Sequence, residues 1–159
     1  MKKTLTPRQA LDRFQALCSR SEQCEHDLRE KMKRWGIMSE AADKIIDRLV
    51  AERYLDNERY ARAFVRDKYR FARWGRIKIS ASLRLKRIDS ATISIALDEE
   101  IDETEYETTA LKVLRAKLTS VAEPTTYEGL NKLFRHAMSR GYESAMIMKL
   151  LKSSDLWEE

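Results

Sequence analysis

Three stretches of the 159-residue chain decide its fold, because they share one pattern of apolar residues. Residues 28–37 read LREKMKRWGI, residues 79–88 read ISASLRLKRI, and residues 133–142 read LFRHAMSRGY. In each, the first, fifth and tenth positions are apolar, and the ninth is Gly in two of the three. Apolar residues four positions apart share one face of a helix, and Gly commonly follows a helix end. A repeat with a period of about 50 residues is typical of stacked helical units.

The residues around these stretches complete units of three helices. Apolar residues at helical spacing predict nine helices, and most of the predicted starts hold a residue that caps helices well. The predicted helices cover about residues 7–19, 22–35, 39–50, 56–74, 77–86, 90–97, 103–118, 126–140 and 143–151. The predicted caps are Thr6, Ser21, Ser39, Asp56, Asp89 or Ser90, and Thr125 or Thr126, while Gly75 is expected to end the fourth helix.

Residues 77–85 are the one ambiguous segment, because their apolar residues alternate with polar ones as in a strand. No second segment alternates in this way, and a lone strand has no pairing partner, so we interpret the segment as helical. The sequence therefore predicts an all-α, elongated fold of three tandem three-helix repeats that resemble helix-turn-helix units. The predicted domains are residues 1–54, residues 55–102 with a basic helix, and residues 103–159.

The charges are unevenly placed along the chain. The net charge is +5, but residues 53–88 hold 12 basic and 3 acidic residues, whereas residues 89–159 hold 8 basic and 14 acidic residues. A local basic field attracts polyanions. The sequence contains no secretory signal and no stretch that is apolar enough to cross a membrane, so we expect a cytoplasmic protein that does not bind membranes.

The basic middle region contains a stripe of arginines. Five arginines are spaced three or four apart, so on one helix they fall within a sector of roughly 80°. Arginine binds phosphate and carboxylate in a bidentate way. We predict that this stripe binds DNA or an acidic protein surface, together with four cations that follow it. The nine residues are Arg59, Arg62, Arg66, Arg70, Arg73, Arg76, Lys78, Lys86 and Arg87.

Two other interpretations of the stripe stay open. The arginines could form a solvated face, or they could pair with acidic residues elsewhere in the fold, which the acidic C-terminal third could supply. Tyr69 and Trp74 flank the stripe and could stack on bases, although packing in or beside the core is the more common role of such residues.

No residue pattern argues for catalysis, for a cofactor or for a metal. The four glycines lie too far apart to form a phosphate-binding loop. Cys18 and Cys24 have no second pair for zinc, and we expect buried thiols of a reducing compartment. His26 and His136 belong to no metal-binding motif, and the acidic residues 98–103 are expected to form a solvated linker. We therefore expect a protein that is not an enzyme.

The run of residues 53–65, RYLDNERYARAFV, resembles the signature of the RecX family, the bacterial regulators of the RecA recombinase. The similarity continues through a basic helix, Gly75 and residues 79–88, and residues 140–142 resemble the third repeat of the family. The resemblance covers residues 10–152.

The sequence departs from the family pattern at two positions. Arg53 and Arg87 stand where a Gly is usual, and the second change removes the preferred residue from a helix end. It also adds a positive charge to the expected binding face.

The resemblance implies three tandem three-helix repeats that bind along the groove of a RecA filament on DNA. It implies inhibition of strand exchange, ATP hydrolysis and co-protease activity by that filament. We expect RecA to be the main partner, with weaker and salt-dependent binding to single- or double-stranded DNA by a monomer. Two alternatives are a sequence-specific helix-turn-helix protein and a scaffolding repeat protein.

Overall fold

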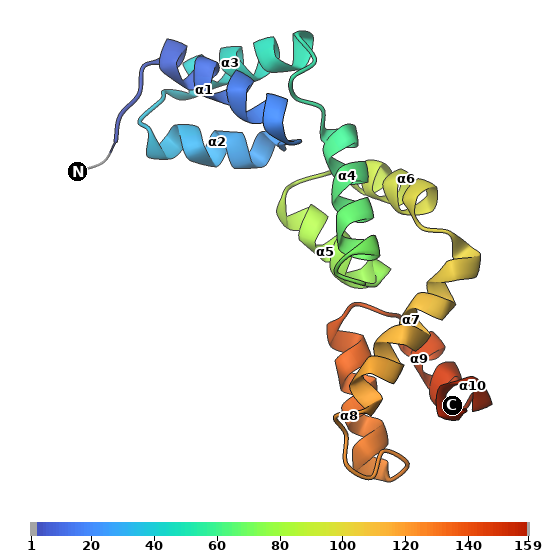
Figure 1. Cartoon of the computed structure of the whole chain (residues 1–159). Helices are drawn as coiled ribbons and strands as arrows, with labels where there is room; N and C mark the ends of the chain where they lie inside the picture. Colours follow the sequence, from blue (N-terminus) through green and yellow to red (C-terminus); the bar gives the residue numbers. More distant parts are fainter. Residues whose placement is uncertain (1–2, 159) are drawn as a thin grey trace.

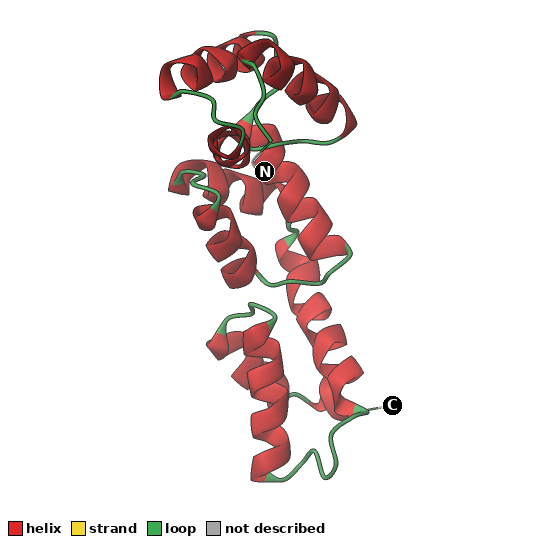
Figure 2. Ribbon diagram, turned by 90° about the vertical axis from the view of Figure 1, so that its left-hand side faces the viewer, coloured by secondary structure: helices red, strands yellow, loops and turns green. Residues whose placement is uncertain are grey.

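The computed structural model describes residues 3–158 as an elongated body of helices, with the N-terminal helices at one end and the C-terminal helices at the other (Figure 1). Figure 2 shows helices and loops only, and no strand occurs among these residues. The all-α prediction is confirmed, and residues 77–85 are helical as expected. The helices are α1 (Pro7–Arg20), α2 (Glu25–Arg34), α3 (Ser39–Ala51), α4 (Asn57–Arg70), α5 (Arg76–Leu85), α6 (Ser90–Glu100), α7 (Glu103–Leu118), α8 (Tyr127–Ser139), α9 (Ser144–Leu151) and α10 (Ser154–Trp157).

The pattern that repeats in the sequence is a helix end followed by a left-handed residue. The residues after α2, α5 and α8 that take this conformation are Gly36, Arg87 and Gly141, with φ of 75°, 58° and 97°. In each case the next N–H bonds to the carbonyl five residues earlier, as in Ile88 N to Leu83 O at 3.2 Å. Arg87 therefore makes the turn that Gly makes in the other two units, at a cost of about 1 kcal/mol or more for the left-handed conformation.

Several predicted helix boundaries are correct and others are wrong. The Asp56, Asp89 and Thr126 side chains accept hydrogen bonds from the first turns of α4, α6 and α8, as expected. Ser21 and Ser39 are not caps, because Cys24 and Met38 occupy the capping positions of α2 and α3 without a side-chain hydrogen bond.

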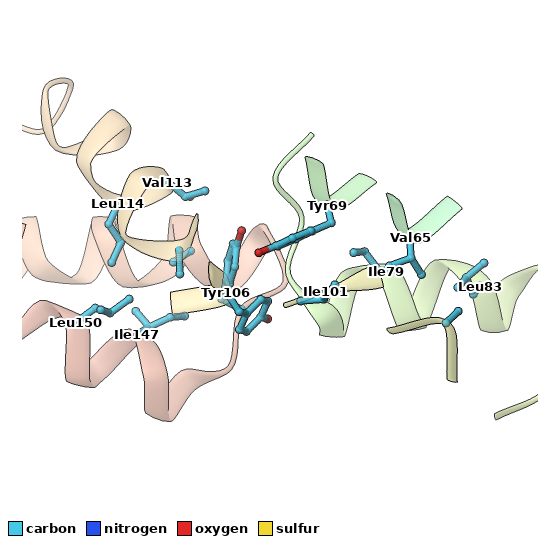
Figure 3. Packing of buried hydrophobic residues seen from close by; sticks show 14 of the residues in the cluster. Val65, Tyr69, Ile79, Leu83, Ile101, Tyr106, Val113, Leu114, Ile147 and Leu150 are labelled. Carbon is cyan, nitrogen blue, oxygen red and sulfur yellow. The ribbon is translucent and has the colours of Figure 1, made fainter. Parts of the chain in front are cut away.

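Among residues 3–158 the buried side chains form two hydrophobic clusters, not one cluster for each of the three units. One contains the buried residues of α1–α3 together with Leu55. The other runs from α4 to α10 and also includes Cys24. Figure 3 shows Tyr69 and Tyr106 between its two halves. The centroids of these two rings are 6.2 Å apart. We call α1–α3 the first unit, α4–α6 the second and α7–α10 the third. The second and third units share one core, and the exact domain boundaries stay a prediction.

Backbone contacts join the second unit to the third. Gly75 N donates to Arg140 O at 2.7 Å, and Ile77 N donates to Gly141 O at 3.0 Å. A Cβ atom on Gly75 would overlap the Gly141 carbonyl, so only glycine allows this approach. The Tyr142 hydroxyl also donates to Arg73 O at 2.7 Å. These contacts leave no room for one unit to slide against the other.

Polar side chains join the first unit to the second. Asn57 Oδ1 accepts from Glu25 N at 3.2 Å, and Arg59 Nε lies 2.9 Å from Glu22 Oε1. The other carboxylate oxygen of Glu22 is buried and has no hydrogen-bond partner among the described residues. A cavity of about 530 Å³ opens beside this joint, with Glu25, Val50 and Arg59 in its lining. The first joint is therefore less tightly packed than the second.

We predict that Gly141→Ala destabilises the fold by about 3 kcal/mol, because it adds strain at φ 97° and a clash with Lys78 N at 2.6 Å. Gly36→Ala is the matched control, since its φ is 75° but its Cβ would meet only Thr4 Cγ2 at 3.7 Å. It should cost about 1 kcal/mol. Urea unfolding measures both changes, and equal losses would show that the close approach at Gly141 contributes nothing.

Candidate nucleic-acid interface

Four of the five predicted stripe arginines lie on α4, and the fifth does not. Helix α4 ends at Arg70 rather than Trp74, so that prediction is wrong. Arg73 lies in the α4–α5 turn with φ 55°, and Trp74 N bonds back to Lys68 O at 2.9 Å. Because of this turn, Gly75 is the residue that precedes α5. The prediction that Gly75 ends α4 is wrong. The stripe is therefore one helical turn shorter than the sequence suggested.

Two stripe arginines pair with carboxylates of α6. Arg62 Nε lies 2.7 Å from Glu99 Oε2, and Arg66 donates two hydrogen bonds to Glu100 at 3.0 and 2.9 Å. The Glu100 side chain is only 13% exposed. The Arg66 guanidinium lowers the pKa of Glu100, chiefly through these hydrogen bonds. These arginines hold α6 against α4, as in the interpretation that assigned their partners to the acidic C-terminal third.

Three further predicted cations connect neighbouring units. Arg59 pairs with Glu22 of the first unit, and Lys86 Nζ lies 2.9 Å from Asp27 Oδ1. Arg76 lies 2.6 Å from a carboxylate oxygen of Glu103 in the third unit. Five of the nine predicted cations thus have intramolecular partners.

The other four predicted cations make no ion pair within 4.0 Å among residues 3–158. Arg70, Arg73 and Arg87 are exposed to solvent. Lys78 Nζ lies over the ring of Trp74, 4.3 Å from its centroid. Three of the four, namely Arg70, Arg73 and Lys78, lie at or beside the α4–α5 turn. Most of the predicted cations that make no ion pair among the described residues are therefore concentrated there.

The α4–α5 turn also carries exposed aromatic surface. Phe71 is 82% exposed, and Trp74 is half-buried between Lys78 and Lys68, whose Nζ lies 4.9 Å from the Trp74 ring centroid. We call Arg70, Phe71, Arg73, Trp74 and Lys78 the turn cluster. The third unit holds the backbone of this turn, because Tyr142 and Arg140 donate hydrogen bonds to its carbonyls.

The turn cluster combines groups that suit a nucleic acid strand. Arginine and lysine bind phosphate oxygens, and an exposed aromatic ring offers a face for a base. The turn is held in place before any ligand binds, which lowers the entropy cost of binding.

Phe71 is a member of the turn cluster that was not predicted from the sequence as a functional residue. A helix continued to residue 74 places Phe71 on the core face, opposite the arginines. Because α4 ends at Arg70, Phe71 lies outside the helix and turns toward solvent. The Arg73-Trp74-Gly75 triplet was the available signal, since Gly commonly starts as well as ends helices.

Tyr69, one of the two predicted flanking aromatics, has a structural role, as does Tyr106 of α7. Tyr69 is buried in the core and its hydroxyl lies 3.0 Å from Thr109 Oγ1. Tyr106 accepts a hydrogen bond from Arg76 N at 3.0 Å and donates one to Glu143 at 2.7 Å. Burial raises the pKa of Tyr106, so its hydroxyl stays protonated and structural.

The described residues contain no group of three His, Cys, Asp or Glu side chains that could hold a metal ion. Burial raises the pKa of both the Cys18 and the Cys24 thiol, which leaves them weak nucleophiles. Within residues 3–158, no helix is long and apolar enough to cross a bilayer.

Comparison with known families decides the identity of the chain. The first three-helix domain of RecX matches residues 10–49, and the second three-helix domain of RecX matches residues 56–97. The chain belongs to the RecX family. The two matched ranges contain α1–α3 and α4–α6 almost completely, so the family models and the helices divide this part of the chain alike.

Relatives named regulatory protein RecX support the assignment. The chain is 33% identical over 132 residues to the one from Clostridium botulinum strain Eklund 17B, covering 82% of this chain but 61% of the relative. It is 28% identical to the one from Prosthecochloris aestuarii, covering 91% of this chain and 92% of the relative. This chain spans between about half and two thirds of the length of the first relatives that it matches.

Solved RecX structures share the fold. The crystal structure of a regulatory protein RecX superposes with a TM-score of 0.81 at 20% identity, covering 92% of this chain and 73% of that one. RecX from Lactobacillus salivarius superposes with a TM-score of 0.78 at 19% identity, covering 94% and 97%. The elongated array of three-helix repeats is thus a property of RecX proteins.

We predict a pH-dependent loss of stability for the Arg66–Glu100 pair. The pKa of Glu100 lies below its ordinary value of 4.5 in the folded chain, so the pair stabilises the fold above about pH 4.5. That contribution is lost as the pH falls through the lowered pKa. Glu100→Gln should therefore cost on the order of 1 kcal/mol at pH 7, since the pair is only partly buried.

Urea unfolding of both proteins at several pH values measures this difference. Other carboxylates titrate in both proteins and cancel in the comparison. A difference in the free energy of unfolding that stays constant from pH 7 to about pH 3 would contradict the assignment of Arg66 as the partner of the ionised carboxylate.

Proposed function

We propose that this RecX protein binds RecA filaments on DNA and mainly inhibits their recombinase, ATPase and co-protease activities. It acts as a monomer in the cytoplasm without catalysis of its own. Its membership of a family of regulatory proteins supports the regulatory role. The observation that carries the proposal is the turn cluster, where three cations that make no ion pair among residues 3–158 surround the exposed ring of Phe71 and the half-buried ring of Trp74.

The shape of the molecule supports binding along a filament groove. The body is long, and the turn cluster lies near its middle, where the second unit meets the third (Figure 1). We propose that Arg70 and Arg73 contact DNA phosphates or acidic RecA side chains, and that Arg87 extends this contact along α5. RecA supplies most of the binding energy, and the DNA contact is weaker and depends on salt.

The remaining predicted residues act indirectly in this proposal. Arg59, Arg62, Arg66, Arg76 and Lys86 already hold carboxylates of the same chain, and they shape the surface that carries the turn cluster. Exchange of these partners for DNA would cost the pairs that align the helices.

The charge of the third helix in the second unit disfavours the sequence-specific helix-turn-helix alternative for that unit. That helix would enter the major groove as the recognition helix. In the second unit it is α6, which contains no basic residue and ends in Asp98, Glu99 and Glu100. A negative helix end would be repelled by the phosphates on both sides of the groove.

We predict that Arg70→Ala combined with Arg73→Ala raises the concentration needed for half-inhibition of RecA ATPase by about 10-fold or more, because two charged contacts are lost. The assay titrates each protein, at substoichiometric ratios, into RecA filaments on single-stranded DNA. The salt dependence of DNA binding should also weaken, by a slope of about 1.4 to 1.8 in log affinity against log salt.

A matched control is Lys132→Ala combined with Arg135→Ala, which removes two exposed cations from α8. This control should inhibit like the parent protein. An equal loss in both variants would show that only net charge matters. If the parent protein fails to inhibit at any ratio, RecA filaments are not its target.

A further inference from the structure

The α4–α5 turn exposes one large aromatic ring, which belongs to Phe71. This residue is 82% exposed. Within residues 3–158, its ring stacks on no other aromatic ring, and no cation lies over its face. The face of the ring is therefore available to a ligand.

The exposure of Phe71 is built into the fold, because the third unit holds the residues that follow it. The Tyr142 hydroxyl donates to Arg73 O at 2.7 Å, and the Arg140 guanidinium donates to Ala72 O. These contacts fix the backbone beside Phe71 before any ligand binds. A ring that is already placed loses less conformational entropy on binding than a ring on a mobile loop.

The neighbouring Trp74 ring is already used inside the molecule. Two ammonium groups lie over it, with Lys78 Nζ 4.3 Å and Lys68 Nζ 4.9 Å from its centroid. Phe64 packs against it edge-on, with ring centroids 6.4 Å apart. Trp74 thus supports the turn, and Phe71 is the member of the turn cluster whose ring can receive a flat ligand.

Cations lie on both sides of Phe71 along the chain. Arg70 precedes it and Arg73 follows two residues later, and both are exposed and make no ion pair within 4.0 Å among residues 3–158. The nearest acidic residue in the sequence is Asp67, whose carboxylate lies 3.9 Å from Lys68 Nζ. The immediate surroundings of the ring therefore favour an anionic ligand.

A nucleic acid strand fits this arrangement better than an acidic peptide does. A peptide also offers carboxylates to the two arginines, but only a strand joins each anionic group to a planar base. One nucleotide can thus stack on Phe71 while the phosphates beside it contact Arg70 and Arg73.

We propose that Phe71 stacks on an unpaired base and that the turn cluster therefore selects single strands over duplexes. In a duplex both faces of a base are covered by its neighbours, so a ring can enter only by separating two bases at a cost in stacking free energy. In a single strand a base can turn out toward an aromatic ring. Arg70 and Arg73 contact phosphates in both forms and do not distinguish them.

This inference rests on the proposed use of the turn cluster and adds the form of its ligand. Since every base has an aromatic face, the selection is for strandedness and not for sequence. Phe71 is the residue that determines it.

Fluorescence anisotropy with the full chain, in the absence of RecA, tests the proposal. The labelled probes are a strand of about 12 thymidine nucleotides, a strand of the same length without bases, and a duplex of the same length. The parent chain should bind the thymidine strand about 10-fold more tightly than the strand without bases. It should also bind the thymidine strand more tightly than the duplex, and this preference should grow as salt rises, because salt weakens duplex binding more steeply.

Variants of Phe71 separate stacking from general apolar contact. Phe71→Ala and Phe71→Leu should each weaken binding of the thymidine strand about 10-fold and leave the other two probes unchanged. Phe71→Tyr keeps the ring and should bind like the parent. Tyr127→Ala is the matched control, since Tyr127 is equally exposed but lies on α8. Circular dichroism should show that all four variants fold.

Three results would overturn the proposal. One is equal weakening of all three probes by Phe71→Ala, because the ring would then contact no base. Another is full retention of thymidine-strand affinity by Phe71→Ala with a loss of RecA inhibition, which would assign the ring to a protein partner. The third is a parent chain that prefers the duplex at every salt concentration. Failure of the parent to inhibit RecA would contradict the proposed function alone, since RecA is absent from the binding assay.

Discussion

The approach of Gly75 to Gly141 is the contact on which the arrangement of this molecule depends. Without a side chain at either residue, the start of α5 lies directly against the turn after α8 and donates two backbone hydrogen bonds to its carbonyl groups. This brings Tyr106 beside Tyr69, so the second and third units share one core. It also anchors the α4–α5 turn, which presents Phe71 in a fixed position. The rigidity of the candidate interface is thus a consequence of packing in another unit.

Much of the fold could be predicted from local sequence patterns, because helix caps and apolar spacing act over a few residues. Asp56 and Thr126 were expected caps and are caps in the structure. The repeated stretches were aligned by sequence alone, and their apolar positions are buried. The end of α4 could not be predicted in this way, because the third unit holds the residues after Arg70, and that unit lies about 70 residues further along the chain.

The candidate site was harder to predict than the fold, because ion pairing is not local. Arg62 and Glu99 are 37 residues apart, and Arg66 and Glu100 are 34 apart. Four of the five arginines lie on helix α4 as predicted. Their spacing in the sequence does not show whether their partners are carboxylates of the same chain or groups of another molecule. Their uneven pairing matters for the proposed function, since three of the four predicted cations that make no ion pair in residues 3–158 lie at the turn where Phe71 is exposed. Our proposal therefore assigns binding to one turn, with Arg87 as an outlying member, and gives the other five predicted residues an internal role.

The first and second units each rely on the next unit to complete the middle helix, and this gives the array a direction. A chain leaves the ribosome with its N-terminus first, and its domains fold in that order. Helix α2 exists before Asn57, which caps it, and α5 exists before Tyr106. The first turns of α2 and α5 are therefore expected to be frayed until the following unit has been synthesised. Helix α8 carries Thr126 as its own cap and closes without waiting. Assembly of these three units thus follows the order of their synthesis, and the middle helix of the third unit needs no later segment as its cap.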